Sequence, residues 1–176
     1  MMLLKGFRQW LQMRQQEMQL QSFAVGMNSS VDVTCDKHIV FMDFDVQDVG
    51  RVERSVRECQ EFWCLGPAFI YGTTHGYHAI FFFDVVPYSR VRLIIEYARD
   101  VDDLFRYISR YYSHKTLRVA GKYKERDIRF VKVVPGCRYP SEEECELGML
   151  KYQEHCLLTG LEPLFDGKMV AGIVRE

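Results

Sequence analysis

The chain has no hydrophobic run long enough to span a bilayer and almost no net charge. Its 23 Lys and Arg residues nearly balance 24 Asp and Glu residues, so a nucleic-acid partner would need a local basic patch. The sequence also lacks the pattern of a secretory signal, because Leu3 and Leu4 are followed at once by Lys5 and Arg8. We therefore expect a cytoplasmic (intracellular) protein with no membrane partner.

The six cysteines include no CxxC pair, and their spacings are irregular. In a chain without an export signal, this pattern predicts reduced thiols rather than a disulfide framework. Cys137, Cys145, His155 and Cys156 are an alternative set of zinc ligands, but their irregular spacing disfavours such a site.

What the chain does have is apolar sequence: 48% of its 176 residues are hydrophobic, enough for one globular domain with a real core. Residues 1–30 are predicted to form an N-terminal amphipathic helix and a linker, since apolar residues recur at helical spacing from Leu3 to Phe23. Gly26 to Ser30 has the composition of a loop. Residues 31–176 are predicted to be a single α+β domain.

Apolar runs and capping residues predict the elements of this domain. Asp48 is the expected N-cap of one helix, and Ser141 with Glu144 forms a capping box for another that ends at Gly160. Strands are expected over 31–33, 38–45, 68–71, 77–84, 116–120, 128–134 and 168–174, and helices over 48–64, 90–99, 102–112 and 141–159. The core order of strand, helix, strand, strand, helix, strand predicts an RNA-recognition-motif-like (ferredoxin-like) antiparallel sheet with flanking helices and an extra β-hairpin formed by 116–120 and 128–134.

Two acids stand at the end of the first clear strand. Side chains alternate along a strand, so Asp43 and Asp45 share one face. The first and third core strands are neighbours in the expected fold, which brings His78 beside them on the face opposite the helices. Two like charges repel, and a hard divalent cation would relieve that repulsion. The alternative is that both acids are simply solvated where the strand exits.

Three motifs resemble those of the archaeo-eukaryotic primase superfamily: the Asp43-Phe44-Asp45 pair, the turn Gly72 to His78, and the segment Leu117 to Lys122. The resemblance implies a primase or primase-polymerase catalytic domain with Asp43 and Asp45 as metal ligands and His78 as a phosphate contact. Thr74 stands near the place of the family's serine. No acid occupies 116–120, so Asp103, next to Asp102, is the candidate third catalytic and metal-binding acid. The predicted nucleotide-binding residues are Thr74, His75, His78, Arg118 and Lys122.

The function implied is a DNA-dependent nucleotidyltransferase that uses two Mg²⁺ or Mn²⁺ ions to make or extend short primers in replication. Its partners would be a single-stranded DNA template, nucleoside triphosphates and a helicase or larger replication subunit, as in plasmid or viral replication. The expected contact for template or primer is a cluster of basic residues: Lys115, Lys122, Lys124, Arg126, Arg129 and Lys132. Tyr111, Tyr112 and Tyr123 are candidate stacking groups, although core packing also explains the first two. The alternatives are a non-catalytic single-stranded nucleic-acid-binding module of the same fold and a metal-dependent nuclease.

Overall fold

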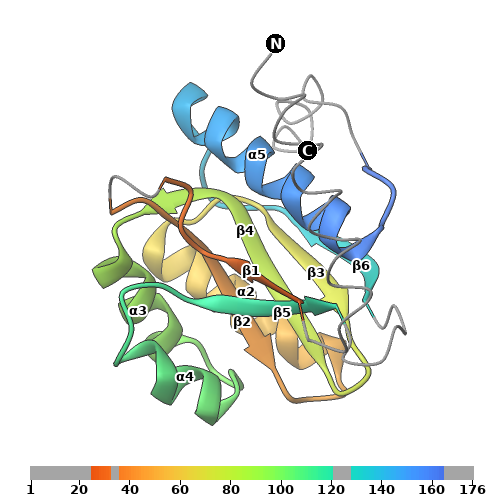
Figure 1. Ribbon diagram of the computed structural model, residues 1–176. Coiled ribbons are helices and arrows are strands. Elements are labelled where there is room, and N and C mark those ends of the chain that lie inside the picture. Colours follow the sequence, from red (N-terminus) through yellow and green to blue (C-terminus); the bar gives the residue numbers. More distant parts are fainter. Residues whose placement is uncertain (1–24, 33–35, 121–127, 165–176) are drawn as a thin grey trace.

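The computed structural model describes residues 25–32, 36–120 and 128–164 (Figure 1). The fold is α+β with antiparallel sheets. Its strands are β1 (Val25–Asn28), β2 (His38–Phe44), β3 (Ala68–Gly72), β4 (Tyr77–Val86), β5 (Thr116–Ala120) and β6 (Arg129–Val134). Its helices are α2 (Val49–Trp63), α3 (Tyr88–Tyr97), α4 (Asp103–Ser109) and α5 (Glu142–Thr159). The expected N-terminal helix, the late strand 168–174, Lys122, Tyr123, Lys124 and Arg126 lie outside the described residues.

The main sheet has four strands in the order β2-β4-β3-β6, and every neighbouring pair is antiparallel. The first and third core strands, β2 and β4, are therefore neighbours in the sheet, as expected. Every residue of β2 except Asp43 is buried, as are nearly all residues of β4, because helices or strands cover both faces of this sheet. A strand pair with so little exposed surface is a rigid base for whatever side chains stand at its end.

Two helices begin as their capping residues predicted. The Asp48 side chain accepts a hydrogen bond from the Gly50 amide at the start of α2, and α5 begins with the capping box of Ser141 and Glu144 and ends at Gly160. α2 ends where it was expected to end, at Cys64, which adopts a left-handed conformation (φ 53°).

Figure 1 shows α2 behind the main sheet and α5 in front of it. The His155 ring of α5 packs 4.4 Å from the Tyr71 ring and 5.6 Å from the Phe82 ring, measured between centroids. Tyr71 pairs with His78 across β3 and β4, so α5 lies over the face that carries His78. The expectation that this face would lie opposite the helices therefore holds for α2, which lies behind the sheet, and is wrong for α5. A free sheet face this apolar would be unstable in water, and α5 buries it.

The smaller sheet differs from the expectation. β1 occupies the segment predicted as a loop and pairs with β5, while β6 pairs with β3, so the expected hairpin of 116–120 with 128–134 is wrong. Gly26 permits this pairing, because a Cβ there would lie 2.3 Å from Cγ2 of Thr116. β1 and β5 cross the front of the main sheet in Figure 1, and β5 also contacts β2. This arrangement places β5 above the end of β2, where the acids stand.

Candidate functional site

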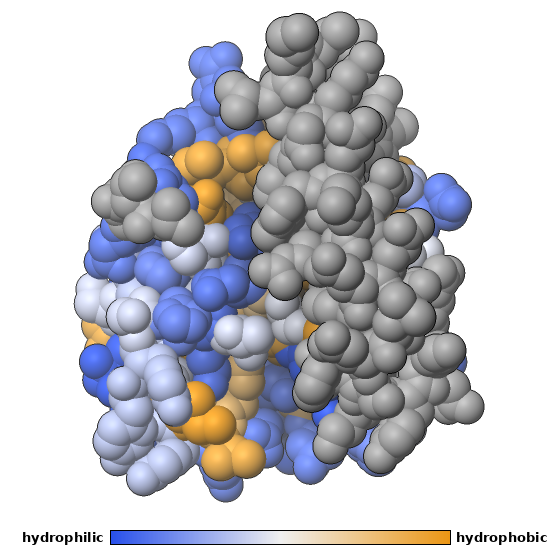
Figure 2. Space-filling model, viewed as in Figure 1, coloured by the Kyte–Doolittle hydropathy of each residue, from blue (hydrophilic) through white to orange (hydrophobic). Residues whose placement is uncertain are grey.

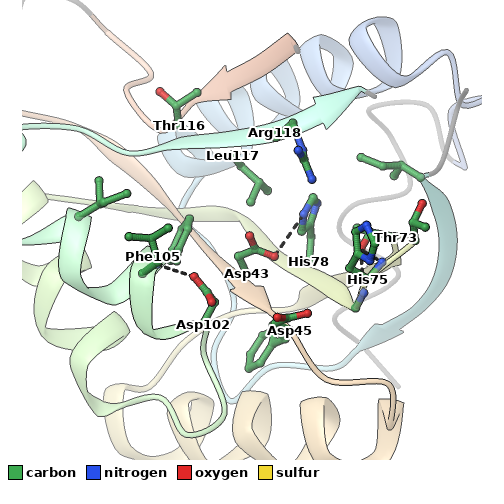
Figure 3. Close-up of a pocket in the computed structure, with 16 residues that line it drawn as sticks. Asp43, Asp45, Thr73, His75, His78, Asp102, Phe105, Thr116, Leu117 and Arg118 are labelled. Carbon is green, nitrogen blue, oxygen red and sulfur yellow. Dashed lines mark hydrogen bonds and ion pairs between the residues drawn. The ribbon is translucent and has the colours of Figure 1, made fainter. Parts of the chain in front are cut away.

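Asp43 and His78 are direct partners across β2 and β4. Oδ1 of Asp43 lies 3.5 Å from Nε2 of His78, and Figure 3 shows the two side chains pointing toward each other. The His78 side chain is only 6% exposed, whereas that of Asp43 is 41% exposed. The pair therefore has one buried member and one that faces solvent.

Burial and neighbouring charges set the protonation of this pair. Burial, assisted by the positive charge of Arg118, lowers the pKa of His78 to about 4, so its imidazole is neutral at neutral pH. Burial raises the pKa of Asp43 to about 6, and the negative charges of Asp102 and Asp45 add to this rise. Nδ1 of His78 is buried and finds no hydrogen-bond partner within the described ranges. A raised carboxyl pKa beside an under-satisfied imidazole is typical of a functional site, although structural networks also produce it.

The turn between β3 and β4 is held by its own backbone. Thr73 donates its amide hydrogen to the Gly76 carbonyl at 2.9 Å, and the Gly76 amide donates to Oγ1 of Thr73 at 3.0 Å. A Cβ on Gly76 would lie 1.8 Å from the Phe44 carbonyl oxygen, so only glycine lets the turn approach the end of β2. Thr74 and His75 are exposed in this turn. The turn is thereby placed next to Asp45, which directly follows β2 and is exposed.

A cavity of about 900 Å³ joins these elements. It is lined by the two acids, the turn, α4 and β5, and every predicted site residue within the described ranges except Asp103 belongs to it: Asp43, Asp45, Thr74, His75, His78 and Arg118. Figure 3 shows Arg118 extending from β5 toward His78. An arginine donates to planar oxyanions in a bidentate geometry, so Arg118 gives this acidic cavity a group that can bind a phosphate.

The third acid at this cavity is Asp102, where the sequence had suggested Asp103. The Asp102 amide donates to the Asp43 carbonyl at 2.8 Å, and its carboxylate caps α4 by accepting from the Phe105 amide at 2.6 Å. The Asp103 side chain is 96% exposed, pairs with Arg106 at 3.2 Å and does not line the cavity. The N-cap side chain must fold back over the first turn, which turns Asp102 inward and the next residue outward.

Lys115 is a functional candidate that the sequence suggested only as part of a basic cluster. The residue is 4% exposed, and its Nζ lies 3.9 Å from the centroid of the Phe105 ring. Burial lowers the pKa of Lys115 to about 8, while the charges of Asp43 and Asp102 oppose that shift. No sequence pattern marked this lysine as buried, because its environment comes from α4 and β2.

The remaining basic residues do not form one patch in the described part of the chain. Lys132 pairs with Glu53 at 2.7 Å on α2, Arg129 is exposed on β6, and Lys115 is buried beside the acids. The expected basic contact for a nucleic-acid backbone therefore depends on residues 122–126, which lie outside the described ranges.

The donor set fits a hard divalent cation in its chemistry. Carboxylates are the ligands that Mg²⁺ and Mn²⁺ prefer, and the repulsion that raises the pKa of Asp43 is the kind that a bound cation relieves. Across the described ranges, however, no three His, Cys, Asp or Glu side chains are already gathered as a metal-binding group. The zinc alternative has no better geometry there, since Cys137 is exposed while His155 and Cys156 lie on the buried face of α5.

No protein-family model, curated protein or solved structure matches this chain. Within residues 25–32, 36–120 and 128–164, no helix combines the length and apolar character needed to cross a membrane.

Proposed function

We propose that this protein is a primase- or polymerase-like nucleotidyltransferase that makes or extends short primers on single-stranded DNA. The observation that carries the proposal is the direct pairing of Asp43 with His78 inside a cavity that Asp45, the Thr73–Gly76 turn and Arg118 also line. The core order β2-α2-β3-β4, with β2 beside β4, supports an RNA-recognition-motif-like core as the finer description of the fold.

The residues have distinct roles in this proposal. Asp43 and Asp45 would hold Mg²⁺ or Mn²⁺, which when bound stabilises the charge on the attacking and leaving oxygens of phosphoryl transfer. Neutral His78 would donate a hydrogen bond to a phosphate oxygen without needing to be protonated first. Arg118 would bind the triphosphate in a bidentate contact, and Thr74 and His75 would contact the same phosphates from the turn.

Asp102 and Lys115 add roles that the sequence had not suggested. Asp102 fixes the Asp43 backbone through its amide and keeps a third negative charge at the cavity. Lys115 offers an ammonium group near the acids, where it would balance charge before nucleotide enters. A helicase or a larger replication subunit would be the protein partner of such an enzyme.

The deciding experiment measures primer synthesis on single-stranded DNA with labelled nucleotides and Mn²⁺. Asp43→Asn and Asp45→Asn should each abolish the product, and Asp103→Asn should retain it because that carboxylate is exposed and lies outside the cavity. Folding of each variant is verified by its thermal melt. Synthesis by Asp43→Asn or Asp45→Asn at the wild-type rate would sink the assignment.

A second candidate is a non-catalytic single-stranded nucleic-acid-binding module of the same fold. The observation that favours it is Lys115, whose buried ammonium offsets the charges of Asp43 and Asp102 without any metal ion. Calorimetry with Mn²⁺ separates the two candidates. If the wild type binds Mn²⁺ and Asp43→Asn does not, the enzyme is supported. If the wild type binds DNA but no Mn²⁺, the binding module is supported.

A further inference from the structure

A second cavity, of about 320 Å³, opens along α4 and the segment that follows it. It shares Asp43, Asp102, Thr116 and the α4 residues Leu104, Phe105 and Ile108 with the larger cavity, so the two are lobes of one depression. Tyr112, His114 and Lys115 line this second lobe and not the first. The apolar face of α4 thus adjoins the acids, and the second lobe adds the Tyr112 and His114 rings beside it.

Several apolar and aromatic side chains of this wall are not used by the core. Leu104 is 64% exposed and Tyr112 is 59% exposed. Tyr107 and Tyr111 are also exposed, and their ring centroids lie 4.9 Å apart. Figure 2 shows pale and orange side chains gathered at the lower left, over α4, beside a hollow. Core packing therefore does not explain Tyr111 and Tyr112, and a concentration of exposed apolar surface marks an interaction site.

We propose that this second lobe, between Leu104, Ile108 and Tyr112, binds a nucleobase. The inference rests on the proposed function, and it names the part of the nucleic acid that this lobe recognises. A base is flat and aromatic, and it gains about 1–3 kcal/mol by stacking on an aromatic side chain. His114 and Thr116, which also line the lobe, offer hydrogen-bonding groups to the edge of the base. The phosphates attached to that base would then extend toward Asp43, His78 and Arg118 in the first lobe.

The position of Lys115 fits this occupant. Its Nζ lies 3.9 Å from the centroid of the Phe105 ring, so the wall of the lobe has a cation packed against an aromatic face. A base entering here meets apolar surface, while the phosphate that follows meets positive charge. A lobe of about 320 Å³ is also at the lower end of the size range of small-molecule sites, which suits one base better than a protein segment.

The test is equilibrium binding of the full chain to two fluorescent oligonucleotides of equal length, one of thymidines and one of abasic sites. Tyr112→Ala should weaken binding of the oligothymidine by about 5- to 150-fold, the range that 1–3 kcal/mol of stacking implies. It should leave the affinity for the abasic strand unchanged. Tyr112→Phe should bind like wild type. Tyr139→Ala is the matched control, because Tyr139 is 64% exposed and lines neither lobe.

A parallel titration with a fluorescent nucleoside triphosphate, competed by inorganic tripolyphosphate, identifies the source of the base. If Tyr112→Ala loses affinity only for the nucleoside triphosphate, the lobe binds the base of the incoming nucleotide. If it loses affinity only for the oligothymidine, the lobe binds a base of the template. Either result supports the inference. Unchanged affinity of Tyr112→Ala for both the oligothymidine and the nucleoside triphosphate overturns it. Because binding is read without synthesis, a wild type that makes no primer but still binds the base would remove the enzyme proposal alone.

Discussion

Asp43 and His78 face each other across β2 and β4, with Oδ1 and Nε2 3.5 Å apart, and their pKa values are displaced in opposite senses. Burial moves the pKa of the acid up to about 6 and that of the histidine down to about 4. Each shift means that folding disfavours the charged form of the group. The pair therefore reduces the stability of the free protein, a cost that proteins commonly carry at functional sites.

The first prediction concerns pH and stability in metal-free buffer. The pKa of Asp43 is raised from 3.8 to about 6 by folding, so its destabilising effect is absent below about pH 4 and complete above about pH 6. Asp43→Asn should therefore raise the melting temperature at about pH 7.5 and have little effect at about pH 4. Thermal melts of wild type and variant at both pH values check this. Identical melting temperatures at about pH 7.5 would contradict it.

The second prediction concerns divalent cations. If Asp43 and Asp45 hold Mn²⁺, an ion concentration 100 times Kd should stabilise the wild type by about 2.7 kcal/mol, or roughly 5–10 °C in melting temperature. Asp43→Asn and Asp45→Asn should lose this stabilisation, and Asp103→Asn should keep it. A cation effect of equal size in all four proteins would point to nonspecific binding.

The third prediction concerns Arg118, which is exposed on β5 and lines the main cavity. Arg118→Ala should weaken triphosphate binding by about 10- to 150-fold, the loss expected for one hydrogen-bonded charged contact of 1.5–3 kcal/mol. The melting temperature should change little, because the Arg118 side chain is exposed. Titration with a labelled nucleoside triphosphate measures the affinity, and Arg129→Ala on β6 is the control variant. Loss of equal size in the control would show that only overall charge matters.

The fourth prediction concerns Gly76 in the β3–β4 turn. Gly76→Ala places a Cβ 1.8 Å from the Phe44 carbonyl, so the turn must move away from β2. We expect a cost of about 3 kcal/mol in unfolding free energy, at the upper end for overpacking, and a parallel loss of nucleotide affinity. Thr74→Ala, in the same turn but exposed, should leave stability within about 0.5 kcal/mol of wild type. Urea unfolding measures both. A fully stable Gly76→Ala would mean that the turn is less tightly placed than described.

The fifth prediction separates a structural acid from a catalytic one. Asp84 is fully buried, and its carboxylate accepts hydrogen bonds from the Gly66 amide and from Arg138 at 2.7 Å. Asp84→Asn should cost about 1–3 kcal/mol, because Arg138 loses one of its two carboxylate partners and keeps only Glu144. The folded fraction of Asp84→Asn should still be stabilised by Mn²⁺. If Asp84→Asn loses this stabilisation as Asp43→Asn does, Asp84 belongs to the cation site.

Local signals in the sequence predicted several elements correctly. The side chain of Asp48, the Ser141–Glu144 capping box and Gly160 determine where α2 begins and where α5 begins and ends, because a cap satisfies backbone groups within one turn. The alternation of side chains, together with the order of the elements, also placed Asp43 next to His78. These predictions succeeded because the caps depend on neighbours in the chain and the Asp43–His78 pairing on one strand pairing of the expected topology.

Other features depended on segments far apart in the sequence. The sequence by itself determined an α+β core, the two acids at the end of β2 and the histidine on β4. Only the tertiary structure decided that Asp102 rather than Asp103 faces the cavity, that Lys115 is buried, that β5 pairs with β1 and that α5 covers the sheet. The physical reason is that caps and side-chain alternation are local, whereas burial and strand partners are set by whichever distant surfaces exclude the most water.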